Sequence, residues 1–587
     1  MENENKSKKI LFLYFFIVLI FLVFLAALFI TVIKPRPLPS LYAQTTEKAH
    51  RGSIISADNF HLALSKKLYK AVVDTRYIDP QKKELFIKLF SIYSGIDQET
   101  IRRKIQAKKG NVVLSFNIDE KTSKYLKKLA FELRRYRVFM ELKNPVTGLL
   151  SIHGLNVLES GETRIYPYGK VLTPIIGYPH KIEKDGYTTV KGVKGLEKKF
   201  DAELQARQDA LQRGLRDVNG YIILNKQSYT KTAINGLDIK LTIPLSLQIK
   251  IENVLDEMKE KLEAKQVMAV VMDMKNGHII TLASSNRFFP KKIKRSDYPF
   301  LRSSAIEYSF EPGSVLKPIT FSLLLDKKLI NPYDLINGHN GHYKIGKKII
   351  TDEHRFSWLS AENVIVYSSN VGMAQLAQKL TGYEFHQGLL QFGFSQKAMP
   401  DMSDERVGSI PSAGRLENEI YKATCSYGYG IKVNLLQLLR AYTVFNNNGK
   451  MITPRLVNSF IDTKTNKIIP TPKYQPIQVI RPETAQRMKK ILIKTVQKGT
   501  GRRTIIKGLE IGGKTGTAHI VEDREYVDKY NTSFIGFAND HKAKYTIAVV
   551  VIKPSTSHYA SKTAVPTFKK IVETLIEDGY LHPNIIK

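Results

Sequence analysis

The stretch Phe310-Glu311-Pro312-Gly313-Ser314-Val315-Leu316-Lys317-Pro318 decides both the fold and the chemistry expected of this chain. Its Pro-Gly pair breaks regular structure, so the sequence predicts a helix that begins at Ser314 and continues through Ile319 to Leu325. The three-residue spacing places the side chains of Ser314 and Lys317 on one face of that helix. Because a serine hydroxyl is a poor nucleophile near neutral pH, it needs a base within hydrogen-bond reach, and Lys317 is the candidate.

Two further motifs, in a fixed order along the chain, strengthen the case for Ser314. Ser368-Ser369-Asn370 lies in a helical setting, and Lys514-Thr515-Gly516-Thr517 follows two glycines and predicts a strand at the edge of a cleft. The Ser-x-x-Lys spacing also occurs at Ser228 to Lys231, but no apolar helix follows it, so a solvated loop is expected there. Ser284-Ser285-Asn286 precedes Ser314, at the end of a predicted strand, and is set aside.

The ordered set of three motifs resembles the penicillin-binding proteins and serine β-lactamases, whose serine is acylated by D-Ala-D-Ala peptides or β-lactams. Ser369-Asn370-Val371-Gly372 resembles the septal, cell-division type (penicillin-binding protein 3) rather than the elongation type. Other segments resemble class B members of the family: Arg51-Gly52-Ser53-Ile54, Arg164-Ile165-Tyr166-Pro167, Gly195-Leu196-Glu197 with Phe200-Asp201 and Leu204, and Tyr427-Gly428-Tyr429-Gly430.

The resemblance implies a role for each residue of the first two motifs. Ser314 would be acylated, Ser368 would relay a proton to the leaving amine, and Asn370 would bind the substrate backbone. An ordinary helix N-cap, with Asn370 as the capping residue, is the competing interpretation of the second motif. An amine acts as a base only while it is neutral, so Lys317 requires burial or a neighbouring cation such as Lys514 to lower its pKa.

The third motif and the backbone complete the expected site. Lys514, Thr515 and Thr517 offer a charge and two hydroxyls to a substrate carboxylate, and Gly516 leaves space where the substrate backbone would lie. The backbone N–H groups of Ser314 and Thr517 are the expected oxyanion hole.

The resemblance also implies a reaction. Acylation by a stem peptide would release terminal D-alanine, and transfer to an amine of a second stem peptide would form a crosslink. The main alternatives are an elongation-type transpeptidase, a D,D-carboxypeptidase and a non-enzymatic membrane-bound β-lactam sensor. Tyr559-Ala560-Ser561 stands where many relatives have paired glycines, so the methyl group of Ala560 and the hydroxymethyl group of Ser561 are expected to narrow the cleft beside the third motif, which β-lactams would enter.

The expected fold class is α+β, with a transmembrane helix, a mixed β-rich pedestal over residues 34–234 and a transpeptidase domain over 235–587. In that last domain an antiparallel sheet is flanked by helices and joined to an all-helical subdomain. Its predicted elements are helices at Pro244 to Ala264 and Pro566 to Glu577, a hairpin of Val267 to Asp273 with His278 to Ala283, and strands at Ser533 to Ala538 and Tyr545 to Ile552. In the pedestal a strand is expected at Val112 to Phe116 and a helix at Lys121 to Tyr136, and Arg51, Arg164 and Glu197 are expected to form structural ion pairs.

An unbroken apolar run, Ile10 to Ile33, is long enough to cross a bilayer of about 30 Å. It predicts an uncleaved single-pass anchor behind a cytoplasmic tail of residues 1–9, with the catalytic domain outside the plasma (inner) membrane. Pro35, Pro37 and Pro39 predict an extended exit from the bilayer. A separate membrane glycosyltransferase and other division proteins are the partners that the resemblance implies.

Charge, cysteine count and histidine spacing argue against nucleic-acid binding, a disulfide and a metal site. The 587-residue chain carries a formal net charge of +36, but its basic residues are spread out and no nucleic-acid motif occurs, so no nucleic-acid partner is expected. Its one cysteine, Cys425, excludes an internal disulfide and is expected to be a small buried side chain. His339, His342 and His354 with Asp352 lack the spacing of a metal site, so neither metal nor cofactor is expected.

Overall fold

The computed structural model describes residues 2–33, 40–143, 150–151, 153–184, 187–217, 222–522 and 525–584. The chain forms two compact units, one of Met1–Ala49 with Gln208–Ala233 and the other of His50–Arg207 with Ile234–Lys587. The predicted proline-rich exit at Pro35, Pro37 and Pro39 lies outside the described residues.

The first unit contains a long apolar helix and a small sheet. Helix α1 (Glu2–Ile33) includes a segment, Asn5–Ile33, with a mean hydropathy of 3.3 that is long and apolar enough to cross a membrane. Strands β1 (Tyr42–Glu47), β10 (Ala210–Leu215) and β11 (Tyr229–Lys231) form an antiparallel sheet in that order. The loop predicted at Ser228 to Lys231 is therefore wrong, since β11 pairs through its backbone with β10 while its side chains stay exposed.

A nine-stranded sheet opens the second unit. Its order is β21-β20-β12-β2-β3-β7-β9-β8, and β4 also pairs with β3. β12 is parallel to β2 and antiparallel to β20, so this sheet joins strands from both sides of the boundary expected near residue 234. Its strands are β2 (Ile54–Ile55), β3 (His61–Asp74), β4 (Asn111–Ile118), β7 (Leu155–Ile165), β8 (Pro179–Lys184), β9 (Tyr187–Gly192), β12 (Asp238–Leu241), β20 (Val457–Asp462) and β21 (Lys467–Pro470).

Three helices lie beside this sheet, α2 (Lys83–Ser94), α3 (Gln98–Ala107) and α4 (Glu120–Arg135). Their apolar faces pack with β3, β4 and β7 around Phe86, Phe90 and Leu126. The strand predicted at Val112 to Phe116 and the helix predicted at Lys121 to Tyr136 are found in β4 and α4.

Buried ion pairs fix the start of this unit, as predicted for Arg51, Arg164 and Glu197. The guanidinium of Arg51 lies 2.8 Å from one carboxylate oxygen of Glu197, and that of Arg164 lies 2.7 Å from the other. Arg51 also pairs with Asp201 at 2.7 Å. Because these charges are hidden from water, removing any one partner would leave an uncompensated buried charge.

The later part of the second unit, the catalytic half that the sequence predicts at residues 235–587, is built on a five-stranded antiparallel sheet of order β14-β13-β25-β24-β23. The predicted hairpin is β13 (Gln266–Asp273) with β14 (Ile279–Ser284), and its turn contains Gly277 at φ +77°. The other strands are β23 (Glu510–Glu522), β24 (Glu525–Asn539) and β25 (Lys544–Ile552).

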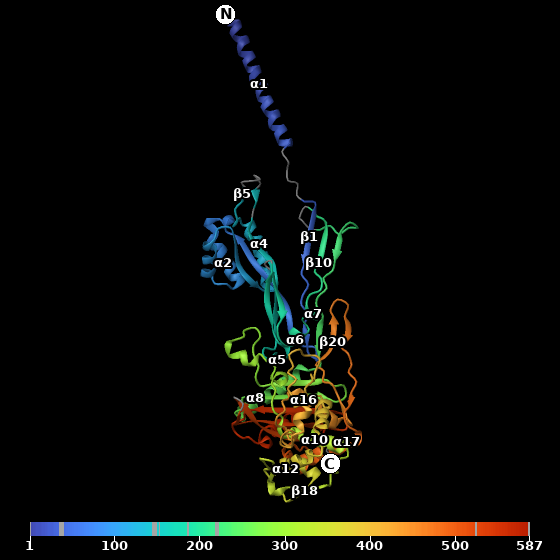
Figure 1. The fold of residues 1–587 in the computed structure, drawn as a ribbon. Helices are drawn as coiled ribbons and strands as arrows, with labels where there is room; N and C mark the ends of the chain where they lie inside the picture. Colours follow the sequence, from blue (N-terminus) through green and yellow to red (C-terminus); the bar gives the residue numbers. More distant parts are fainter. Residues whose placement is uncertain are drawn as a thin grey trace. The chain divides into compact units, whose positions relative to one another are not determined.

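Helices cover both faces of this sheet (Figure 1). Alternate residues of β13 pack into two separate cores, which explains why the strand is apolar throughout. Val267, Ala269 and Val271 meet α8 (Leu245–Lys261) and α18 (Ala564–Glu577), both close to their predicted ranges. The opposite core contains α10 (Lys317–Asp326), α11 (Ala361–Val366), α12 (Asn370–Ala377), α13 (Gly382–Gln391), α15 (Glu419–Ser426), α16 (Leu435–Asn446) and α17 (Pro482–Lys498).

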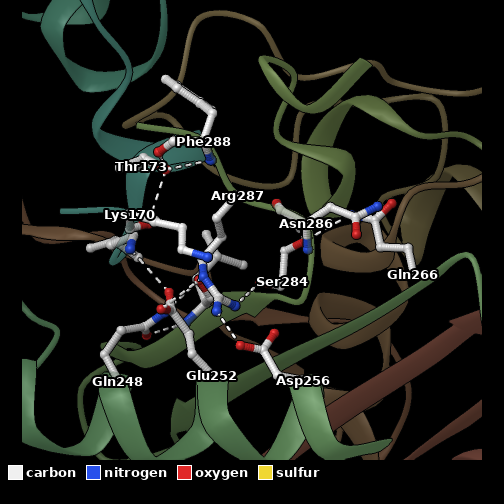
Figure 2. A network of polar contacts seen from close by, with 12 residues as sticks. Lys170, Thr173, Gln248, Glu252, Asp256, Gln266, Ser284, Asn286, Arg287 and Phe288 are labelled. Atoms are coloured by element: carbon white, nitrogen blue, oxygen red, sulfur yellow. Dashed lines mark hydrogen bonds and ion pairs between the residues drawn. The ribbon is translucent and has the colours of Figure 1, made fainter. Parts of the chain in front are cut away.

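A second buried polar network anchors α8 (Figure 2). Glu252 pairs with Arg287 at 3.2 Å and accepts hydrogen bonds from Gln248 at 2.9 Å and from the backbone of Leu172 at 3.0 Å. Burial raises the pKa of Glu252 to about 7, although Arg287 opposes that shift. The network thus ties the turn at Leu172, which has φ +58°, to the catalytic half.

Candidate active site

Ser314 lies in a tight turn rather than in an α-helix. Gly313–Leu316 form one 3-10 turn, and α10 begins only at Lys317, so the prediction of a helix starting at Ser314 is wrong in detail. Pro318 is then the second residue of α10, where a missing backbone N–H costs no intrahelical bond. The buried Tyr442 hydroxyl donates to the carbonyl of Val315 at 2.6 Å and thereby stabilises the turn.

Lys317 is fully buried and points at the second motif. Its ammonium donates to the backbone carbonyl of Ser368 and, at 3.2 Å, to the Ser368 hydroxyl. Ser368 has φ +65°, a left-handed conformation that non-glycine residues rarely adopt. The strained backbone turns both polar groups of this residue towards one amine.

Lys514 reaches the same hydroxyl from the sheet. It is fully buried in β23 and donates to Ser368 Oγ at 2.9 Å and to the carbonyl of Thr515 at 3.1 Å. The Thr515 hydroxyl is also bonded to that of Thr500 at 2.7 Å. One serine hydroxyl therefore accepts hydrogen bonds from two buried amines.

Burial changes the protonation of both lysines. It lowers the pKa of Lys317 to about 7, although Asp352 and Glu353 act in the opposite direction. Burial lowers the pKa of Lys514 well below its ordinary value, and the charge of Lys317 adds to that shift. Desolvation, rather than the charge of Lys514, is thus the cause of the lowered pKa of Lys317.

Asn370 is the first residue of α12, and Ser369 is its cap. The Ser369 hydroxyl accepts from the backbone N–H of Gly372 at 2.8 Å, so capping by Asn370 itself is wrong. The Asn370 side chain donates to the carbonyl of Thr351 at 3.0 Å. Asp352 accepts from the Ser369 hydroxyl and from the backbone N–H groups of Asn370 and Val371.

Asp352 is a functional candidate that the sequence analysis weighed only as a metal ligand. In the described part of the chain, no three His, Cys, Asp or Glu residues are grouped so that they could hold a metal ion. The contacts of Asp352 instead place a negative charge at the start of α12, where the helix dipole favours it. Asp352 is too distant in sequence from Asn370 and Val371 for local spacing to reveal this contact.

Glu311 is a second residue that the sequence analysis missed. One carboxylate oxygen accepts from the backbone N–H of Gly430 at 2.8 Å and from the Tyr526 hydroxyl at 3.3 Å. The other oxygen is buried without a hydrogen-bond partner among the described residues. Gly428, with φ +97°, approaches so closely that a Cβ there would lie 2.1 Å from the carbonyl oxygen of Gly313. The Tyr427 to Gly430 loop is thus fixed directly behind Ser314.

The motifs meet in a pocket of about 380 Å³. Ser314 is half-buried in its wall, and Ser368, Asn370, Thr515 and Thr517 line it as well. The remaining wall comes from Thr351 to His354, Phe356, Tyr367, Ser369, Tyr429, Thr500, His519, Tyr530 and His558. Three separated segments of sequence therefore present hydroxyls and an amide to one small space.

Gly516, the segment from Tyr559 to Ser561 and Cys425 are not among the residues that line this pocket. A Cβ on Gly516 would lie 2.4 Å from the Ser533 hydroxyl and 2.9 Å from the carbonyl of Pro312, so protein atoms already fill the space that was expected for substrate. His558 lines the pocket, whereas Tyr559 to Ser561 are not among its lining residues. Cys425 is buried as predicted, and burial raises the pKa of its thiol to about 12, which leaves it unreactive.

Two family models match the chain. Residues 267–573 match the penicillin binding protein transpeptidase domain, and residues 46–241 match the penicillin-binding protein dimerisation domain.

Curated relatives cover nearly the whole length. A peptidoglycan D,D-transpeptidase FtsI from Buchnera aphidicola is 27% identical over 100% of this chain and 97% of the relative. The stage V sporulation protein D of Bacillus subtilis is 26% identical over 100% of this chain and 88% of its own. A probable peptidoglycan D,D-transpeptidase PenA from Neisseria meningitidis is 26% identical over 90% of this chain and 84% of its own.

Solved structures share the fold. Penicillin binding protein 2X from Streptococcus thermophilus superposes with a TM-score of 0.73 at 21% identity, covering 92% of this chain and 82% of that one. A peptidoglycan synthetase from Bifidobacterium adolescentis superposes with a TM-score of 0.69 at 21% identity, covering 93% and 98%.

Proposed function

Because this chain belongs to the penicillin-binding protein transpeptidase family, we propose that it is a serine D,D-transpeptidase that crosslinks peptidoglycan stem peptides. One observation carries the proposal. Ser314 opens into the same pocket as Ser368 and Thr517, while the buried amines of Lys317 and Lys514 converge on the Ser368 hydroxyl. This arrangement supplies a nucleophile, a base whose pKa lies near neutrality and a path for the proton.

The first half of the reaction forms an acyl-enzyme. Ser314 Oγ attacks the carbonyl carbon of the penultimate D-alanine as neutral Lys317 takes its proton. The peptide bond to the terminal D-alanine then breaks, and the departing nitrogen receives a proton through Ser368. Proton transfer by positioned groups of this kind contributes about 10²- to 10⁴-fold in rate.

The second half transfers the acyl group. An amine of another stem peptide attacks the ester carbon, loses a proton to the same relay, and frees Ser314 as a new peptide bond forms. Attack by water instead would make the protein a carboxypeptidase. β-Lactams, which resemble the donor peptide, would acylate Ser314 and stop there.

Backbone donors and hydroxyls orient the donor. The N–H groups of Ser314 and Thr517 would stabilise the oxyanion, and one such donor is worth roughly 10²- to 10³-fold in rate. The hydroxyls of Thr515 and Thr517 would bind the terminal carboxylate beside Lys514. Asn370, held by Thr351, would bind the peptide backbone.

The expected cellular setting is the septum. The Ser369 to Gly372 segment and a relative named FtsI support a role in division, and α1 fits a single-pass anchor with residues 1–9 in the cytoplasm. The pedestal (34–234) and catalytic domain (235–587) would then lie outside the plasma membrane, together with a separate membrane glycosyltransferase and other division proteins. Depletion of the protein should make cells filament; rounded cells would indicate elongation instead.

The chemical test is the mass of the intact chain after exposure to benzylpenicillin. We expect one covalent adduct on the wild-type protein and none on Ser314→Ala. An adduct that persists in the alanine variant would overturn the assignment of Ser314. Release of D-alanine from a stem pentapeptide, with a crosslinked product, separates the transpeptidase from a sensor that is acylated once without turnover.

A further inference from the structure

A second cavity lies apart from the catalytic pocket and shares none of its lining residues. It has a volume of about 910 Å³ and opens where three strands of the five-stranded sheet end. Gln266 begins β13, Ile552 ends β25, and Ile520 to Glu522 end β23. The cavity therefore borders the strand that carries Lys514, at the end away from that residue.

Four cations rim the cavity, from four separate segments: Lys265, Arg302, Arg406 and Lys432. All four residues are exposed. Within the described parts of the chain, their side chains donate no hydrogen bond and form no salt bridge. We call this cavity, with the four cations at its rim, the basic cavity.

The carboxylates of the same wall are already satisfied. Glu307 pairs with Lys194 at 2.8 Å, and Glu522 pairs with Lys529 at 3.1 Å and with Lys553. Glu405 accepts from the backbone of Ala398 at 2.8 Å. The charges of Glu307 and Glu522 are balanced by lysines, whereas Glu405 accepts only from uncharged donors. The four exposed cations therefore outnumber the one carboxylate of this wall that has no ion-pair partner, and the basic cavity presents net positive charge to a ligand.

The walls between the cations are partly apolar. Pro299, Phe300, Tyr308 and Val407 line the space together with Ile552. Positive charge beside apolar surface suits a peptide with carboxylates and small aliphatic side chains better than a bare phosphate polymer. Arginine in particular presents a planar fork that matches a carboxylate.

We propose that the basic cavity binds a carboxylate-bearing peptide, separately from the catalytic pocket. If the proposed function holds, the source in the cell wall is a stem peptide of a second strand, which would keep substrate polymer next to the enzyme between turnovers. The binding itself is a property of the cavity and does not depend on Ser314 chemistry.

The test uses the full-length chain in detergent after acylation by benzylpenicillin, so that the catalytic pocket is blocked. The probe is the fluorescent tripeptide L-alanyl-γ-D-glutamyl-L-lysine, which carries two carboxylates and lacks a D-Ala-D-Ala terminus. One variant combines K265Q, R302Q, R406Q and K432Q. The matched control combines K275Q, K467Q, K473Q and K490Q. These substitutions remove the same amount of charge from four exposed lysines elsewhere.

We expect fluorescence anisotropy to show salt-dependent binding that falls about tenfold in the cavity variant and is unchanged in the control. Equal losses in both variants, or no binding to the wild type, would overturn the proposal. Inorganic tripolyphosphate that binds while the tripeptide does not would also overturn it, because the site would then recognise phosphate. Benzylpenicillin acylation of each variant checks folding and tests the proposed function independently.

Discussion

Lys317 and Lys514, from a helix and a strand almost two hundred residues apart, donate hydrogen bonds to one oxygen atom, that of the Ser368 hydroxyl. Two ammonium groups so close, both fully buried, repel each other and lack water to screen the charge. The site is therefore most stable with at least one amine neutral. A neutral Lys317 is what the proposed attack by Ser314 requires.

Replacing Ser368 by alanine removes the atom that the two amines share. We expect Ser368→Ala to lower the rate of acylation by benzylpenicillin by about a hundredfold, because proton transfer loses its relay. Stopped-flow acylation measures the rate. The neighbouring change Ser369→Ala is the control: it removes the cap of α12 and should cost about 1 kcal/mol of stability with a much smaller effect on acylation. Similar rate losses in both variants would refute the relay.

The pKa of Lys317 predicts how acylation depends on pH. Below about pH 7 the amine is protonated and cannot accept the Ser314 proton, so the rate should rise with pH and level off above about 7. The second-order rate constant of acylation, measured from pH 5 to 9, gives the profile. A profile that is still rising steeply at pH 9 would show that Lys317 keeps an ordinary lysine pKa.

Glu252 predicts a separate effect of pH on stability. Its pKa is raised to about 7 in the folded chain, so the folded state holds a proton that the unfolded state has lost between about pH 4.5 and 7. This contribution is full below about pH 4.5 and is lost as the pH rises through 7. Its size is up to about 3 kcal/mol.

The variant Glu252→Gln should flatten that dependence, since it cannot titrate. Chemical unfolding at a series of pH values compares it with the wild type, and the exposed residue Glu257 provides a control as Glu257→Gln. Identical pH dependence in the wild type and Glu252→Gln would show that Arg287 keeps the carboxylate ionised.

Glu311 tests whether the loop behind the serine matters. Glu311→Ala removes the acceptor of the Gly430 N–H and the contact with Tyr526, so we expect slower acylation, by about tenfold. Glu311→Gln keeps an acceptor oxygen and should retain most of the rate, because the other carboxylate oxygen has no partner to lose. Equal rates in the alanine variant and the wild type would exclude a positioning role.

The three motifs could be found from sequence because each is a short local pattern, and apolar residues at helical spacing placed α8 within a few residues of its observed bounds. The 3-10 turn at Ser314 could not, since it depends on Tyr442 and on the close approach of Gly428. The contacts of Asp352 and Glu311 were not foreseen for the same reason, because their partners come from other segments. The sequence analysis attributed the glycine at position 516 to the space needed by a substrate. In the structure, Ser533 and Pro312 lie so close that they leave no room for a Cβ there.

The nine-stranded sheet restricts which parts of such genes can be exchanged between relatives. Ile239 of β12 is paired with Ile54 of β2 on one side and with Phe460 of β20 on the other, so a single strand is shared by the two matched domains. In a hybrid joined just before β12, that strand would pair with a β2 from the other parent on one edge and with a β20 from its own parent on the other. Viable mosaics should therefore inherit the Ile54 region together with the catalytic half.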